Sequence, residues 1–144
     1  MGIISMPSGD GEFDKVTFTP AFAAGTATFD SLGGYYFRWG NFMVGAAKAA
    51  VTGAGSTTLT FTIPESLTID GDWILDTSAT SIADVLGNGK WFDAGSAYRG
   101  LNPIWNSTTT LAFFFDGGSS LVGSGLANLD KLSFRFMIPI AEWA

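Results

Sequence analysis

The 144-residue sequence contains no cysteine and no histidine. Without cysteine the chain has neither a disulfide framework nor a thiolate nucleophile, so the redox state of its compartment cannot be inferred. Without histidine it lacks the ligand of most zinc sites and the usual imidazole base of hydrolases. We therefore expect no metal site, no cofactor and no enzymatic activity.

Charged residues are also scarce, at 14% of the chain with a net charge of −6. The seven basic residues are scattered along the sequence, whereas a nucleic-acid surface needs clustered Lys and Arg to neutralise phosphates. No apolar run approaches the roughly 18 residues needed to span a bilayer, and the N-terminus lacks a basic segment followed by an apolar one. We expect neither nucleic-acid binding nor membrane insertion.

Apolar and aromatic residues are abundant, at 47% and 15% of the chain. Thirteen Phe together with many Thr, Ser and Gly favour strands and turns over helices. A surface with so few charges leaves apolar area that is more naturally buried against a partner or against copies of the same chain. The composition therefore indicates a subunit of an assembly, with copies of itself or another protein as partner.

Residues 31–64 are expected to form a long β-hairpin around which the other strands pack. Its second run, 58–63, alternates Thr with Leu, Phe and Ile, as a half-buried strand does. Turn residues at 52–56 separate this run from an aromatic run at 35–44. Pro64 ends the pairing because it has no amide hydrogen to donate.

Strand-like segments recur on both sides of this hairpin, with turn residues between them. We expect short strands at 13–19, 25–30, 73–75, 90–92, 108–115 and 132–140. Asn88-Gly89 predicts a two-residue hairpin turn, Pro103 a break, and Pro139 an edge near the end of the last strand. Residues 80–86 are the one candidate for a helical turn. The pattern predicts an all-β fold with about eight to ten strands and little or no helix, an antiparallel β-sandwich of jelly-roll type.

The chain divides into an arm and one domain. Residues 1–12 are expected to be an N-terminal docking arm, and residues 13–144 a single β-sandwich domain. Ile3, Ile4 and Met6 give the arm its apolar start and are the candidate docking residues. Such an arm is mobile when free, so a neighbouring subunit is the simplest candidate for holding it.

Short motifs along most of the chain carry a family resemblance. They are Phe18-Thr19-Pro20, Gly25-Thr26-Ala27-Thr28, the segment 34–40 (GYYFRWG), the turn 52–56, the strand 59–64 (LTFTIP) and the closing segment 138–143 (IPIAEW). In this order they resemble a β-sandwich module of tailed-bacteriophage virions, found in tail-fibre tips, minor tail proteins and head decorations. The resemblance implies a trimer at the virion surface, with capsid or tail proteins of the same particle as partners.

The sequence departs from the tail-fibre pattern at its start. The arm is short, and neither a heptad repeat nor a collagen-like shaft precedes the domain. This favours a non-enzymatic structural subunit that decorates or stabilises the capsid or tail lattice. The alternative is a receptor- or glycan-binding tip of a tail fibre.

Aromatic residues are the candidates for a sugar-stacking platform on such a tip. They are Trp39, Trp73, Trp91, Tyr98 and Trp105. Trp91, Tyr98 and Trp105 are the best candidates for surface recognition, because Gly, Asn and Asp in expected loops surround them. For Tyr36, Phe42 and Trp143 packing is the expected role, as large aromatics supply most of the contact energy in cores and interfaces.

Acidic residues give the weakest functional signal. Asp70, Asp72, Asp76, Asp84 and Asp93 could be imagined as the paired carboxylates of a glycosidase, or the first three as calcium ligands. Asp-Gly, however, is above all turn chemistry, and the spacing of an EF-hand is not in place. Structural turns are therefore the preferred interpretation, and a hydrolase is the third and most distant hypothesis.

Overall fold

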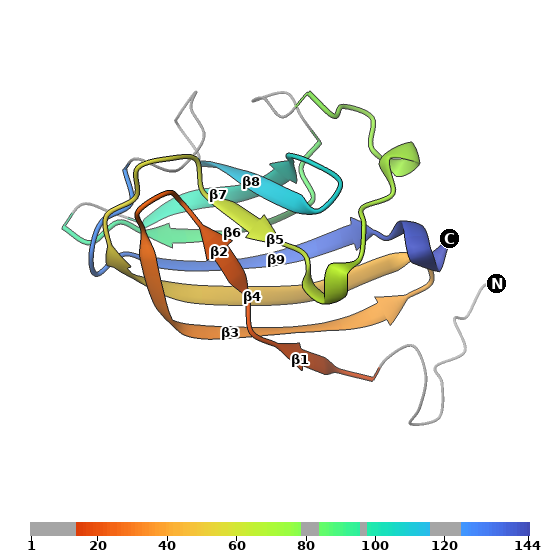
Figure 1. The fold of residues 1–144 in the computed structure, drawn as a ribbon, viewed down its shortest axis with the longest axis horizontal. Helices are drawn as coiled ribbons and strands as arrows, with labels where there is room; N and C mark the ends of the chain where they lie inside the picture. The colour runs from red at the N-terminus through yellow and green to blue at the C-terminus, as the bar shows by residue number, and fades with distance from the viewer. Residues whose placement is uncertain (1–13, 79–83, 96–97, 116–124) are drawn as a thin grey trace.

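The computed structural model describes residues 14–78, 84–95, 98–115 and 125–144. Within these residues nine antiparallel strands form one strongly curled sheet, a half-barrel, in the order β1-β3-β4-β9-β6-β7-β8-β5-β2 (Figure 1). The strands are β1 Val16–Phe18, β2 Ala21–Ala23, β3 Thr28–Trp39, β4 Phe42–Gly53, β5 Thr60–Thr62, β6 Gly87–Phe92, β7 Tyr98–Trp105, β8 Thr110–Phe115 and β9 Lys131–Pro139. The described residues contain no α-helix, only the 3₁₀ turns η1 Pro64–Ser66, η2 Gly71–Trp73 and η3 Ala141–Trp143. The all-β prediction is confirmed, and the jelly-roll sandwich stays a prediction.

The two ends of the sheet are joined by a two-residue link. β1 pairs with β3 at one end of the strand order, while β2, which follows after Thr19 and Pro20, pairs with β5 at the other end. Pro20 cannot donate to a ladder and its φ is fixed, so the chain leaves one ladder there and enters another. This link requires the sheet to curl until its ends approach each other.

The central hairpin exists, but its partner strand was predicted wrongly. β3 pairs with β4 around a turn at Gly40 and Asn41, and Gly40 has a φ of 59°. The Thr/Leu run expected as the second arm is β5, which pairs with β2 and β8. β4 was missed because most of its buried positions hold small residues, such as Gly45. These residues differ little in polarity from their neighbours, so the sequence shows no alternation there.

Two expected chain breaks lie inside strands. Asn88-Gly89 belongs to β6 because Gly89 packs against the Ser133 carbonyl oxygen and the Phe134 side chain, where the missing Cβ is what allows the contact. Pro103 belongs to β7 and lies opposite Phe113, and its carbonyl accepts a hydrogen bond of 2.8 Å from the Leu86 amide. The predictions of a hairpin turn and of a break are therefore wrong.

Two further predictions need correction. β9 lies in the middle of the sheet between β4 and β6, so Pro139 ends a central strand instead of marking an edge. Trp73 closes the 3₁₀ turn η2 and does not begin a strand, since the Asp70 carboxylate accepts from the Asp72 amide and caps that turn. Residues 80–83 of the candidate helical segment 80–86 lie outside the described residues.

The core is built on β9 as the sequence predicts. Its alternate residues are buried, namely Leu132, Phe134, Phe136, Ile138 and, just after the strand, Ile140. The Phe134 ring meets Phe61 from β5 at 5.1 Å and Phe113 from β8 at 4.9 Å between centroids, both edge to face. Opposite parts of the curled sheet thus share one aromatic core, and such pairs add about 1 kcal/mol each beyond the burial of their area.

One buried carboxylate fixes the loops where β9 begins. Asp130 is fully buried and accepts hydrogen bonds from the Trp91 indole at 3.1 Å, the Ala94 amide at 2.8 Å and the Ala127 amide at 2.9 Å. It therefore ties the end of β6 to the segment that leads into β9. In the described part of the chain no helix has the length and apolar character of a membrane span.

Candidate functional site

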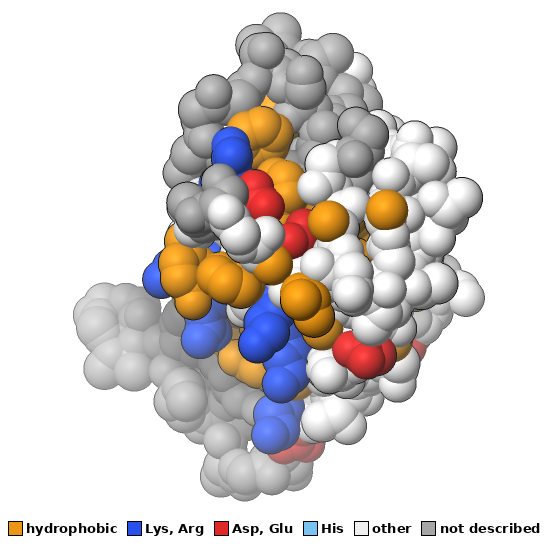
Figure 2. Space-filling view, turned by 90° about the vertical axis from the view of Figure 1, so that its left-hand side faces the viewer, with side chains coloured by type: hydrophobic (Ala, Val, Ile, Leu, Met, Phe, Trp, Pro, Cys, Tyr) orange, Lys and Arg blue, Asp and Glu red, His pale blue; other side chains and the backbone are white. Residues whose placement is uncertain are grey.

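Five of the seven basic residues gather on the outer face of the sheet. Strand alternation turns Lys48 of β4, Lys90 of β6, and Lys131 and Arg135 of β9 away from the core, and all four are exposed. The register brings them together, because Ser133 lies opposite both Lys48 and Lys90. With exposed Lys15, just before β1, they form what we call the basic sheet face. Figure 2 shows Lys and Arg side chains in a band across one side of the molecule.

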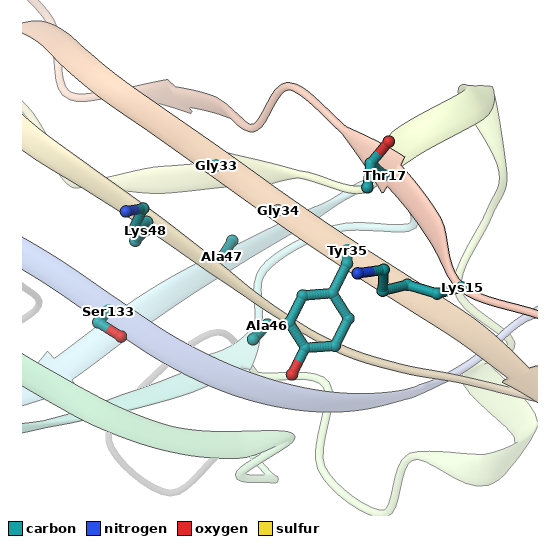
Figure 3. Close-up of a pocket in the computed structure, with 9 residues that line it drawn as sticks. All are labelled: Lys15, Thr17, Gly33, Gly34, Tyr35, Ala46, Ala47, Lys48 and Ser133. Atoms are coloured by element: carbon teal, nitrogen blue, oxygen red, sulfur yellow. The ribbon is translucent and has the colours of Figure 1, made fainter.

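A hollow of about 270 Å³ lies in this face between Lys15 and Lys48. Gly33 of β3 lies opposite Lys48 of β4 and Gly34 opposite Ala47, and the stem of Lys48 lies over Gly33. Figure 3 shows Tyr35 and Lys15 on one side of these small residues and Lys48 on the other. The hollow is therefore bordered by two ammonium groups and one phenol, with small residues of β3 and β4 between them.

Tyr35 links the basic groups around the hollow. The Arg135 guanidinium donates from Nη1 to the Tyr35 hydroxyl at 3.1 Å, and the Lys15 ammonium lies 6.0 Å from the centre of the Tyr35 ring. Because the hydroxyl oxygen accepts from Arg135, its own hydrogen remains available for an acceptor in the hollow. The chemistry of this arrangement suits a carboxylate or another anion.

The cations of the basic sheet face form no ion pair with an acidic side chain among the described residues. The ion pair that the described part of the chain contains joins Arg99 to Asp93 at 3.5 Å. Arg99 also packs over the rings of Trp91 and Phe115, at 5.7 and 5.2 Å from their centroids, and is not part of this face. Exposed Asp30 shares a register row with Lys131 through Ala50 but forms no ion pair with it, so the face keeps a net positive charge.

The predicted surface positions of Trp91 and Trp105 are wrong. Their side chains are only 4% and 9% exposed, because the loops expected around them are strands β6 and β7. Trp91 is held by Asp130 and meets Phe115 edge to face at 5.6 Å. Both tryptophans pack in the core. Their strands were not recognised because Gly and Pro interrupt the alternation of large residues that would identify a strand in the sequence.

Tyr98 is the predicted recognition residue that does lie at the surface. Its side chain is 71% exposed and stacks on Phe92, with 4.9 Å between ring centroids. Phe92 lies opposite Lys131 in the register, so this aromatic pair borders the basic sheet face. The predicted docking residues Ile3, Ile4 and Met6 lie outside the described residues.

Other aromatics divide between packing and an exposed apolar patch. Tyr36 is buried, and Trp143 packs 6.2 Å from its ring, as expected for packing residues. Trp73 is 57% exposed and rests edge to face on Phe42 at 5.6 Å. Trp39, which is also exposed, lines an open hollow of about 410 Å³ with Phe42.

Tyr36 also titrates unusually. Burial is the main cause that raises the pKa of Tyr36 to about 12, followed by its hydrogen bond to the Glu65 carboxylate and the charge of that group. Glu65 itself adopts a φ of 62°, a left-handed conformation that non-glycine residues rarely take. The hydrogen bond from the phenol thus helps to hold a strained turn against β3.

Acidic side chains gather at the end of the molecule that carries η1, η2 and η3. We call this the acidic end; it comprises Glu65, Asp70, Asp72, Asp76, Asp84 and Glu142. Hydrogen bonds from the amide and then the hydroxyl of Thr68, at 3.0 and 2.7 Å, lower the pKa of Glu142. Bonds from Ser78 likewise lower the pKa of Asp76. Within the described residues no three potential ligands among His, Cys, Asp and Glu come together as a metal site would require.

Sequence reasoning missed the basic sheet face as a site. Lys15, Lys48 and Lys90 stand more than 30 residues apart in the chain, and only the strand register brings them together. One signal was present, because Lys131, Ser133 and Arg135 alternate with buried residues and had to share a face. Comparisons with protein-family models, curated proteins and solved structures give no match to this chain.

Proposed function

We propose that this chain is a non-enzymatic structural protein of a tailed-bacteriophage virion, a trimeric knob that decorates or stabilises the capsid or tail lattice at the particle surface. The observation that carries the proposal is the surface of the domain, which leaves large apolar side chains and an unpaired basic face uncovered. Leu75 is 97% exposed and Tyr98 71%. Such surface is more naturally buried in an assembly than left in solvent. The motif resemblance supplies the kind of assembly.

The mechanism would be mechanical. Ile3, Ile4 and Met6 of the arm dock on capsid or tail proteins, and neighbouring copies bury aromatic surface against each other. Binding to the assembled lattice alone stabilises that lattice by mass action.

We also propose that the domain is an antiparallel β-sandwich of jelly-roll type. Two features support this: the curled sheet packs its two halves onto one aromatic core, and the segment around Pro20 pairs with both halves through β1 and β2. In β-sandwiches, too, strands pass from one sheet to the other at bends.

A receptor- or glycan-binding tip is the second candidate. One observation favours it: the Tyr98–Phe92 pair lies at the surface beside the basic sheet face. The hollow in that face is bordered by Tyr35 and two lysines. Aromatic faces and charged hydrogen-bond donors are what an acidic sugar requires.

A binding experiment separates the two candidates. Labelled protein is mixed with bare particles that lack it and, separately, with host cells. We expect saturating, stoichiometric binding to particles, lost on deletion of residues 1–11, and no binding to cells. Binding to cells that free sugar competes away, unaffected by the deletion, would contradict the structural role and establish the second candidate.

A further inference from the structure

The domain carries two exposed surfaces of opposite charge. The basic sheet face has five cations, although the whole chain has a net charge of −6. The acidic end has six carboxylates, and Arg38 is the one cation beside it among the described residues. Arg38 is already engaged, donating to the carbonyl oxygens of Gly40 at 2.8 Å and Trp143 at 3.2 Å. Each surface thus has an excess of charge that the other could neutralise.

Both surfaces also hold exposed apolar side chains. Trp73 and Leu75 lie beside the carboxylates of the acidic end, and Tyr98 and Phe92 border the basic sheet face. Exposed ion pairs contribute little by themselves, about 0–1 kcal/mol each. Burial of apolar side chains contributes about 25 cal/mol per Å², so it can supply affinity while the charges select the partner surface.

The two surfaces point to different neighbours. The 3₁₀ turns of the acidic end lie where β9 finishes, at one end of the long axis of the molecule (Figure 1). Lys131 starts β9 at the other end, and Lys48 lies two residue pairs further along. Figure 2, in which the left-hand side of Figure 1 faces the viewer, shows the basic band on that side. One copy can therefore use both surfaces at once.

We propose that the basic sheet face of one copy binds the acidic end of a second copy, with a carboxylate of that end in the hollow between Lys15 and Lys48. Unlike surfaces meet in such a contact, so it is heterologous; it forms a ring, such as a trimer, when the rotation between copies closes, and an open filament when it does not. A twofold dimer through the basic faces is disfavoured because it would oppose like charges. The inference deepens the proposed function but concerns the purified chain alone, so its test does not depend on particles.

The hollow has groups that attract a carboxylate. Lys15 and Lys48 border it from opposite sides, and the Tyr35 hydroxyl, whose oxygen accepts from Arg135, can still donate a hydrogen bond. Asp72 is the best placed donor of that carboxylate. It lies on the exposed turn η2 next to Trp73, so one contact could insert the charge and bury the ring.

Sedimentation velocity of the full chain tests the contact. The face variant is Lys48→Glu with Lys131→Glu; the end variant is Asp72→Lys with Glu142→Gln, the amide keeping an acceptor for Thr68. The control, Ala23→Glu with Thr57→Glu, adds negative charge at exposed positions that belong to neither surface. We expect wild type and control to associate at low salt, and each charge variant to associate at least about tenfold more weakly.

Mixing the two variants is the decisive arm. The face variant keeps a competent acidic end and the end variant a competent basic face, so together they should form 1:1 heterodimers although each alone is monomeric. Wild-type association should also weaken about tenfold between 50 and 300 mM salt, a readout that needs no variant. Near-UV circular dichroism verifies that each variant is folded.

Three results would overturn the inference: a wild type that stays monomeric at about 100 μM in low salt, association that both variants leave unchanged, or folded variants that fail to pair. Retention of a monomeric wild type on immobilised polygalacturonate, lost in the face variant, would assign the face to an anionic polysaccharide instead. Failure of particle binding alone would leave this contact intact and count only against the proposed function.

Discussion

Single residues hold this domain together where its loops converge. Asp130 is the clearest case, since its buried carboxylate satisfies three donors from two separate segments. No sequence pattern identifies such a residue, because Asp130 follows a leucine in a loop and cannot be distinguished in the sequence from an aspartate that only forms a turn. Its role depends on where Trp91 and the Ala94 amide come to lie, which is a tertiary property.

Replacement of Asp130 should therefore be costly. In Asp130→Ala the buried Trp91 indole and two partly buried amides lose their acceptor. A buried unsatisfied group costs about 1–3 kcal/mol and a partly buried one less, so we expect a loss of about 2–4 kcal/mol in the free energy of unfolding. Urea denaturation followed by tryptophan fluorescence measures it. Asp72→Ala, on an exposed turn, is the matched control and should change stability by less than about 0.5 kcal/mol. Equal effects in both variants would show that Asp130 anchors nothing.

The phenol of Tyr36 gives stability a dependence on alkaline pH. Its pKa is about 12 in the folded state and 10.0 without the protein environment, so the unfolded state loses this proton first as the pH rises. The contribution is fully present below pH 10, falls between pH 10 and about 12, and is lost above that. We expect a fall of about 2 kcal/mol over this window that Tyr36→Phe lacks, measured by urea denaturation at fixed pH values. Parallel pH profiles would refute the assignment.

At the scale of elements, small residues decide which strands can approach. Gly45 of β4 packs against the Tyr35 carbonyl oxygen. A Cβ added to Gly45 would lie 2.8 Å from Tyr36 Cα and 2.9 Å from the Phe136 ring. Gly87 and Gly89 of β6 meet the backbone of β9 in the same way. These strands have few large side chains to mark them, so the sequence reads as turns where the structure has the sheet's centre.

Gly45→Ala tests this packing. The added methyl group would overlap backbone atoms that cannot move independently, and we expect a loss of about 2 kcal/mol or more. Gly71→Ala is the control, because a Cβ added there would have its nearest neighbour, an atom of the Trp105 ring, 3.9 Å away. Thermal unfolding of both variants gives the comparison. A Gly45→Ala protein as stable as Gly71→Ala would mean that β3 and β4 can separate without cost.

The sequence predicts strands well only where large apolar residues mark them clearly. β9 was predicted with its buried face, and β1 to within a few residues, because large apolar and polar residues alternate there. β8 was predicted to within a few residues as a continuous apolar run after threonines. β4, β6 and β7 were missed or broken because Ala, Gly and Pro fill them. The errors at Trp91 and Trp105 follow directly, since a strand mistaken for a loop moves its tryptophan from core to surface.

At the scale of the whole molecule, charge that is scattered along the chain becomes organised in space. The basic sheet face collects cations from β4, β6, β9 and the residue before β1, and the acidic end collects carboxylates from three 3₁₀ turns and their flanks. Charge counts along the sequence predicted a weakly charged surface and could not predict this asymmetry, which depends on strand order. The self-association experiment above measures its consequence.

The link at Pro20 has a mechanical consequence. The strands at the two ends of the sheet are consecutive in the chain, so β1 cannot leave β3 by more than a few ångström without drawing β2 away from β5. A pull applied at Asp14, where the arm meets the domain, is therefore divided between two ladders on opposite sides of the core. In the proposed role as a knob at a particle surface, a domain tethered in this way would resist the pull through both ladders instead of unzipping from one edge.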